Sequence, residues 1–186
     1  MEPEFVTMQG KVTFYPLGYL WNGALRAFEV AKTDRTGSNY DRVSAALFCA
    51  FAVEAHLNHI GESQWPFWGA IDRLSWKSKL LLIADKLSLK ADFGCRPFST
   101  LIELFDFRNH LAHGRNQTDE VSYQYRNDED DFTNTDPKWL MRYWSDAAIE
   151  RNLTDVQQVM ELFLEKAGFD KGTLALMGDG ELSQSE

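Results

Sequence analysis

The hydrophobic positions of this chain repeat mostly with helical spacing. Helices are predicted at about 17–32, 40–60, 71–87 and 97–113, and a last helical region at about 137–167 that breaks near Trp144 and Ser145. Gly61 and Gly114 follow the second and fourth of these segments, where glycine commonly ends a helix. The pattern predicts an all-α fold, a helical bundle of about five helices.

The second predicted helix is apolar almost all round. Its middle reads SAALFCAFAVEAHLNHI, which leaves no broad polar face for solvent. Such a helix is typical of the centre of a bundle. Ser38 or Asn39 is expected to cap its start, because short polar side chains can accept hydrogen bonds from the first free backbone amides.

Two short segments alternate in the manner of strands. One is 11–15, which ends at Pro16, and the other is 120–126. We expect at most one short peripheral β-hairpin, with these two segments as its strands. The Gly- and Ser-containing residues 168–186 are expected to form a loose tail. The chain is thus predicted to be a single domain, 1–186, with a helical core at about 17–167.

The composition is that of an ordinary globular protein. Apolar residues make up 44% and charged residues 25% of 186 residues. The net charge of −9 argues against a general nucleic-acid-binding surface, so any RNA site must be a local basic pocket. The opening residues MEPEFVTMQG lack a signal-peptide pattern, and no apolar run is long enough to span a bilayer. We therefore expect a cytoplasmic protein without a membrane partner.

Other conspicuous residues have ordinary structural interpretations. Cys49 and Cys95 are expected to be buried free thiols. The aromatic segments 65–68 and 139–144 are expected in the core or in a dimer interface, and the acidic run 127–131 in a solvated loop.

Two charged residues interrupt apolar helix faces. Arg108 lies in the middle of a broad face of the fourth helix, which is formed by Leu101, Leu104, Phe105, Phe107, Leu111 and Ala112. Glu54 interrupts the second helix, and Asn58 lies one turn further on the same face. A lone charge is costly to bury, so Arg108 and Glu54 are predicted to face each other where the two helices pack. The pair could also be no more than a structural ion pair that sets the helix register.

The end of the fourth helix carries further polar groups. Asn109 and His113 are four residues apart and share a face, whereas Arg108 and His113 are about 140° apart on an ideal helix. Spacing alone therefore does not bring Arg108 to His113. They converge only if the helix loosens at Gly114, if the long Arg side chain reaches round, or if a symmetric dimer joins two copies. The helix C-terminus favours an imidazolium at His113, which suits proton transfer.

The segment Arg108-Asn109-His110-Leu111-Ala112-His113-Gly114 resembles the Arg-x4-His motif of the HEPN superfamily, a group of small helical domains common in bacterial toxin–antitoxin and antiviral systems. The preceding segments AFAVEAHLNHIG and WKSKLLLI come in the order expected for that family. The resemblance covers roughly residues 17–167. It implies a HEPN-like bundle, a homodimer with two motifs in one cleft, and metal-independent endoribonuclease activity.

The resemblance also implies roles for individual residues. His113 would transfer protons at the ribose 2′-hydroxyl or the leaving 5′-oxygen, and Arg108 would stabilise the phosphorane. Asn109 would orient the site or contact phosphate, and Glu54 would hold Arg108. Asn58 and His110 are further candidates for binding or orienting substrate. The product would carry a 2′,3′-cyclic phosphate.

Two alternatives use the same residues. The pairs His56/His59 and His110/His113 have HxxH spacing, but no Cys or carboxylate is placed to complete a metal site, so neither a metal nor a cofactor is expected. The second alternative is a non-catalytic, HEPN-like interaction or dimerisation module that binds a protein partner. The acidic charge and the rich aromatic content favour this alternative, and the intact motif favours the ribonuclease.

Overall fold

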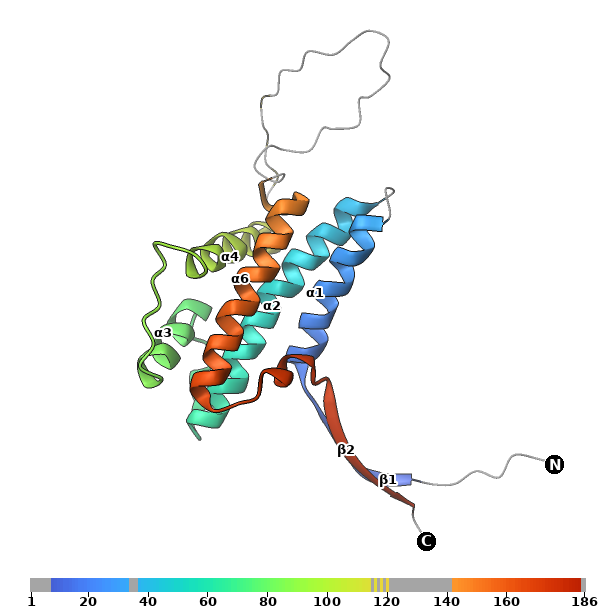
Figure 1. Ribbon diagram of the computed structural model, residues 1–186, viewed down its shortest axis with the longest axis vertical. Coiled ribbons are helices and arrows are strands. Elements are labelled where there is room, and N and C mark those ends of the chain that lie inside the picture. The colour runs from blue at the N-terminus through green and yellow to red at the C-terminus, as the bar shows by residue number, and fades with distance from the viewer. Residues whose placement is uncertain are drawn as a thin grey trace, which may run out of the picture.

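The computed structural model describes residues 8–33, 37–114, 116, 118, 120 and 142–184. Among these residues lie the α-helices α1 (Pro16–Thr33), α2 (Ser38–Gln64), α3 (Trp76–Lys86), α4 (Phe98–His113) and α6 (Asp146–Ala167). Helices α1, α2 and α6 run side by side, α4 crosses them near one end, and α3 lies toward the other (Figure 1). The predicted all-α bundle with one short β-hairpin is confirmed.

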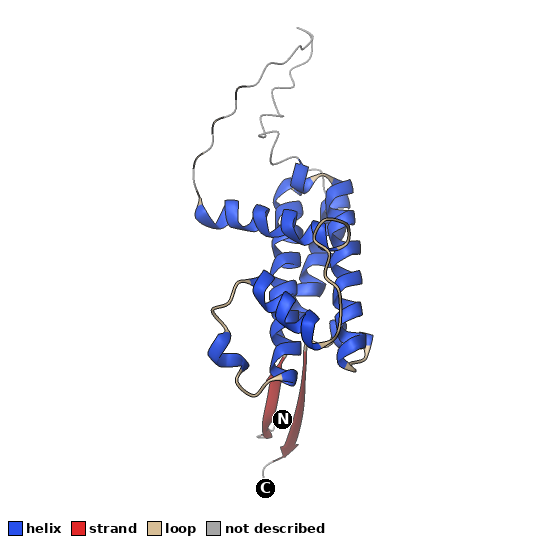
Figure 2. Cartoon of the chain, turned by 90° about the vertical axis from the view of Figure 1, so that its left-hand side faces the viewer, coloured by secondary structure: helices blue, strands red, loops and turns tan. Residues whose placement is uncertain are grey.

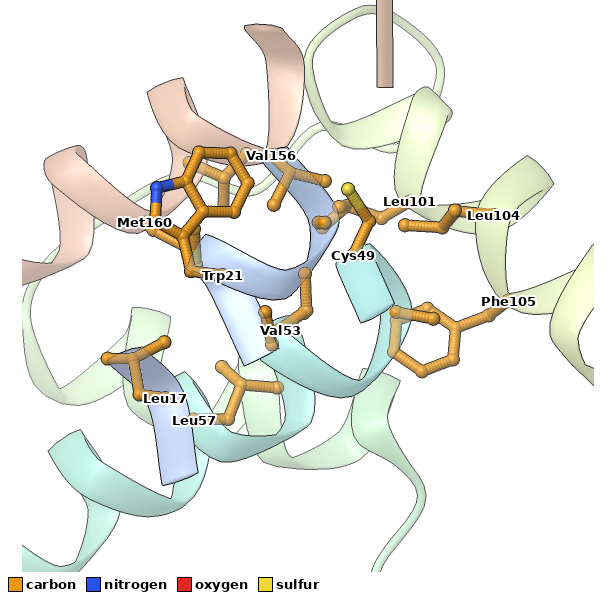
Figure 3. Close-up of a cluster of buried hydrophobic side chains, with 14 of the residues drawn as sticks. Leu17, Trp21, Cys49, Val53, Leu57, Leu101, Leu104, Phe105, Val156 and Met160 are labelled. Carbon is orange, nitrogen blue, oxygen red and sulfur yellow. The ribbon is translucent and has the colours of Figure 1, made fainter. Parts of the chain in front are cut away.

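Helix α2 lies at the centre of the bundle, as its composition predicts. It packs against α1, α4 and α6, and ten of its residues are buried. The side chains that meet around it come from four helices and form one core (Figure 3): Leu17, Trp21, Cys49, Val53, Leu57, Leu101, Leu104, Phe105, Val156 and Met160. Helix α3 joins this core through Trp76, whose ring stacks on Phe105 with centroids 4.1 Å apart.

By length and composition alone, α2 could also cross a membrane. Half of its most apolar window is buried inside the bundle, as in the core helix of a soluble protein. The length and apolar composition of this one helix are therefore only weak evidence for a membrane span.

Serine caps define two helix starts. The Ser145 hydroxyl accepts a hydrogen bond from the Ala148 amide, which begins α6 and explains the predicted break near Trp144. The Ser75 hydroxyl caps α3 in the same way, through the Ser78 amide. The third helix is therefore shorter than the predicted 71–87, and a separate 3-10 turn, η1 (Trp68–Ile71), precedes it.

The start of α2 differs from the prediction. Its cap position is Gly37, in a left-handed conformation with φ of 82°, and no side chain caps the helix. The Ser38 hydroxyl instead accepts a hydrogen bond from Arg42, at 2.7 Å. Neither Ser38 nor Asn39 caps the helix, so the prediction of an N-cap at one of these residues is wrong.

Gly61 does not end α2, contrary to the prediction. The helix continues to Gln64, and Gly61 lies buried within it. A Cβ atom at this position would lie 2.1 Å from the Trp68 indole. Gly61 is therefore needed for close packing of η1 on α2. Gly114, in contrast, does end α4 as predicted, with φ of 56°.

A two-stranded antiparallel ribbon joins the two ends of the described chain. Strand β1 (Met8–Phe14) pairs antiparallel with β2 (Gly178–Gln184), in a register that sets Phe14 opposite Gly178. The ribbon projects from one end of the helical body (Figure 2). The prediction of a loose tail at 168–186 is therefore wrong, as is the predicted partner of the first strand.

Packing against the bundle orders this C-terminal segment. Leu174 in the turn η2 (Lys171–Ala175) is buried. The chain then passes so close to α1 that a Cβ atom on Gly18 would overlap the Leu176 carbonyl oxygen. The Tyr15 amide donates to the Met177 carbonyl at 3.1 Å, which closes the base of the ribbon.

Several sequence predictions fall outside the described residues. They are the strand at 120–126 apart from Glu120, the acidic run 127–131, and positions 137–141 of the last helical region. Of the two thiols, Cys49 is buried as predicted, and burial raises its pKa to about 12. Cys95 is exposed, in the turn before α4, so the prediction of a second buried thiol is wrong.

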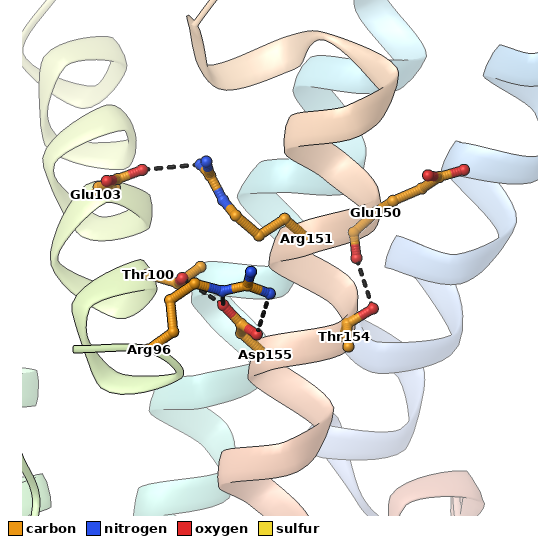
Figure 4. A network of polar contacts seen from close by, with 7 residues as sticks. All are labelled: Arg96, Thr100, Glu103, Glu150, Arg151, Thr154 and Asp155. Atoms are coloured by element: carbon orange, nitrogen blue, oxygen red, sulfur yellow. Dashed lines mark hydrogen bonds and ion pairs between the residues drawn. The ribbon is translucent and has the colours of Figure 1, made fainter.

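A polar network fastens the first half of α4 to α6 (Figure 4). The buried Asp155 carboxylate accepts two hydrogen bonds from Arg96, at 2.6 and 2.8 Å, and a third from the Thr100 hydroxyl. A second ion pair joins Arg151 to Glu103 at 2.8 Å, one turn further along α4. These contacts fix the position of α4 relative to α6.

We expect Asp155→Asn to lower the free energy of unfolding by about 2 kcal/mol at pH 7, because charge-assisted hydrogen bonds are lost. Burial alone would raise the pKa of Asp155, but the hydrogen bonds from Arg96 and Thr100 outweigh it and hold the pKa below its usual value. The contribution of Asp155 is therefore complete above about pH 4 and is lost as the pH falls through the lowered pKa. Urea unfolding across this range measures both effects.

Glu161→Gln is the matched control, since Glu161 forms a surface ion pair with Lys171. Its cost should stay within about 1 kcal/mol. Stability curves of wild type and Asp155→Asn that remain parallel down to pH 2 would contradict the assignment.

Candidate functional site

The predicted pair of Arg108 and Glu54 is confirmed. Arg108 Nη2 donates to Glu54 Oε2 at 2.9 Å, which links α4 to α2. Arg108 Nη1 donates to the Asn109 side-chain oxygen at 3.0 Å. The Arg108 guanidinium also lies near two rings, with its Cζ 5.7 Å from the centroid of Phe51 and 6.0 Å from that of Phe105.

The pair lies at the surface of the bundle and is not sealed within it. The side chains of Arg108 and Glu54 are 28% and 32% exposed. The guanidinium has five N–H donors, and two of them make these bonds within the described part of the chain. A ligand from solvent can therefore still reach the charge of Arg108.

His113 is exposed at the end of α4 and is not joined to Arg108 by a hydrogen bond in the described part of the chain. The helix remains regular up to Gly114, so the two side chains keep the angular separation of an α-helix. His110 lies between them in the sequence, and its Nδ1 is 2.7 Å from the main-chain carbonyl oxygen of Asp106. Because a carbonyl oxygen only accepts, Nδ1 of His110 carries the proton. The structure thus gathers Arg108, Glu54 and Asn109, and leaves His113 apart.

Asn58 belongs to a different polar cluster. Its side-chain oxygen accepts from Lys79 Nζ at 2.9 Å and from the Trp68 indole at 3.2 Å. Lys79 is buried and also pairs with Asp72 at 2.8 Å. Asn58 shares the face of α2 with Glu54, as predicted, but its hydrogen bonds orient Lys79 and Trp68.

The sequence analysis did not single out Lys79. The signal was present, because Lys79 is spaced three and four residues from Trp76 and Ile83, on the apolar side of α3. A charge at that position requires a partner, just as Arg108 does. The sequence prediction also missed the Asp155 network. The signal was again a charge on an apolar face, because Asp155 lies among Val156, Val159 and Asn152 on the buried face of α6.

The two histidines of α2 that share HxxH spacing lie in different surroundings. His56 is buried between helices, beside Phe163, and burial lowers its pKa to about 3. His56 is therefore a residue of the bundle core. His59 contacts Tyr15 and Phe169 at the base of the ribbon. Among the described residues, no three His, Cys, Asp or Glu side chains are grouped so that they could hold a metal ion.

Comparison of the chain with known protein families, with characterised proteins and with solved structures finds no match.

A double-mutant cycle tests whether Glu54 and Arg108 interact. We expect a coupling free energy of about 0.5–1 kcal/mol between Glu54→Ala and Arg108→Ala, because the pair is about one-third exposed and screened by solvent. Urea unfolding of the two single variants and the double variant measures it. Glu54→Ala combined with Arg151→Ala is the control and should be additive, since Arg151 pairs with Glu103. Additivity in the Glu54–Arg108 cycle as well would contradict the contact.

Proposed function

We propose that this protein is a metal-independent endoribonuclease of HEPN type that acts as a homodimer. The observation that supports it best is the solvent-accessible Arg108 between α2 and α4, held by Glu54 and Asn109. A guanidinium held in this way is a rigid, permanently charged donor, which suits the stabilisation of a phosphorane.

The surface beside Arg108 supports the dimer. Phe48 and Phe51 on α2 are each 37% exposed, and Phe48 lies against Gly23 of α1. We call Phe48 and Phe51 the aromatic face. At the start of α1, Tyr19 and Phe14 form a further exposed pair, with their rings 4.7 Å apart. Clustered exposed rings favour an interface, and a second copy of the chain would cover them here.

The dimer would also bring Arg108 and His113 close to each other. Within one chain the helix holds His113 away from Arg108, so a cleft with both groups would combine residues of two copies. In that cleft one His113 would take the proton of the ribose 2′-hydroxyl as the 2′-oxygen attacks phosphorus. The bond to the 5′-oxygen would break, and an imidazolium would protonate that oxygen. The products would be a 2′,3′-cyclic phosphate and a free 5′-hydroxyl.

A non-catalytic interaction module is the second candidate. The net charge of −9 and the aromatic face favour this function, because both suit a protein partner better than a polyanion. Such a module would form a stable dimer or a complex with a protein partner and would not cleave RNA.

Arg108→Ala and His113→Ala should each reduce cleavage of a structured RNA by about 100-fold or more, since each removes a group required in the transition state. The assay contains EDTA, and product analysis should find a 2′,3′-cyclic phosphate end. Arg73→Ala removes the same charge from an exposed turn and should leave cleavage unchanged. Absence of cleavage by the wild type, or equal rates in all variants, would favour the non-catalytic module.

Phe48→Asp should convert the proposed dimer into a monomer, because it places a charge within the aromatic face. Sedimentation velocity of the full chain measures this change. Leu81→Asp is the control, since Leu81 is similarly exposed but lies on α3. A wild-type chain that sediments as a monomer at high concentration would contradict the dimer.

A further inference from the structure

A cleft lies at the end of the bundle where α2 begins and α4 ends. It has a volume of about 540 Å³. Its walls come from three places: the start of α2, the last turn of α4 and the residue before the α6 cap. The lining residues are Gly37, Ser38, Asn39, Tyr40, Val43, Leu111 and Trp144.

Aromatic and apolar side chains form most of this cleft. Tyr40 is 80% exposed and makes little use of its ring in packing. Trp144 is half-buried, and Val43 and Leu111 supply aliphatic surface. The wall is open to solvent and carries two rings with large flat faces.

Neighbouring contacts hold the two sides of the cleft in place. Tyr143 stacks on Phe107 of α4 with centroids 5.2 Å apart, and Ser145 caps α6, so both neighbours of Trp144 are fixed. On the other side, Arg42 of α2 pairs with Asp146 of α6 at 2.6 Å. The cleft is therefore built on the ends of three helices that are tied together.

The rim of the cleft offers hydrogen-bonding groups. The Ser38 hydroxyl accepts from Arg42 and keeps its own proton to donate. Asn39, next along α2, lies at the same rim, and its side-chain oxygen accepts from Arg42 Nη1 at 3.4 Å. Aromatic side chains with a hydroxyl donor at the edge match a planar base with a polar edge.

The cleft is close to the proposed site. Leu111 follows Arg108 by three residues, which is about 4.5 Å along the axis of α4. It also precedes His113 by two residues. A nucleotide whose phosphate lies at Arg108 would therefore have a neighbouring base within reach of the cleft.

We propose that this cleft, lined by Tyr40, Val43, Leu111 and Trp144, binds a nucleobase of the RNA strand next to the scissile phosphate. The proposal rests on the proposed function, and it adds a substrate-positioning site that the motif does not contain. Stacking on Tyr40 and Trp144 supplies the binding, so the site prefers unpaired RNA and tolerates different bases.

The experiment titrates the full chain with the four nucleoside 5′-monophosphates and with a dinucleotide that carries a 2′-deoxy sugar and cannot be cleaved. Binding is followed by nuclear magnetic resonance shifts of the Trp indole protons. Tyr40→Ala and Trp144→Ala should each weaken dinucleotide binding about ten-fold. Tyr40→Phe, which keeps the ring, should restore wild-type binding.

Phe67→Ala is the matched control, because Phe67 is an exposed ring beside η1 and outside the cleft. This variant should bind the dinucleotide as tightly as the wild type. Tyr40 has so little packing that its replacement should leave thermal unfolding unchanged, so folding does not confuse the result. Absence of nucleotide binding by the wild type, or equal binding by Tyr40→Ala, would overturn the proposal.

The two proposals fail in different ways. Nucleotide binding that depends on Tyr40, in a protein that does not cleave RNA, would support the base site and overturn the catalytic function. Cleavage that depends on Arg108 but is insensitive to Tyr40→Ala and Trp144→Ala would support the catalytic function and overturn the base site.

Discussion

The burial of α2 is the constraint on which the rest of the structure depends. This helix is apolar over nearly its whole circumference, so the chain must cover it with other helices. Helices α1, α4 and α6 cover most of it. The part that remains at the surface carries Phe48, Phe51 and Glu54. The candidate site lies there because α4 crosses α2 at the border between the covered and the uncovered side.

The first turns of helix α4 are bound to α6, whereas its last turns lie at the surface. Its first turns are tied to α6 through Asp155 and Glu103, both of which meet arginine side chains. Its last turns carry Arg108, Asn109 and His113 at the surface. A rigid base therefore positions a polar end, an arrangement suited to a site that must hold its side chains in place for a ligand.

The two kinds of ion pair on α4 differ in their surroundings. Asp155 is buried and satisfied by three hydrogen bonds, so it serves the stability and the orientation of the helix. Glu54 and Arg108 remain about one-third exposed, so their mutual attraction is screened and their contribution to stability is small. The exposure of the pair leaves the guanidinium of Arg108 accessible from solvent.

The sequence by itself determined the helical class, the bounds of α4, the break before α6 and the pairing of Glu54 with Arg108. Local periodicity, caps and the cost of an unpaired charge decide these features. Only the tertiary structure decided that Gly61 packs beneath Trp68, that Asn58 binds Lys79, and that residues 178–184 form a strand. Each of these depends on a contact with a residue outside the local pattern, and a single sequence does not reveal which distant residues will meet. The separation of Arg108 from His113, in contrast, follows from local spacing, because the regular helix α4 keeps their side chains on different faces.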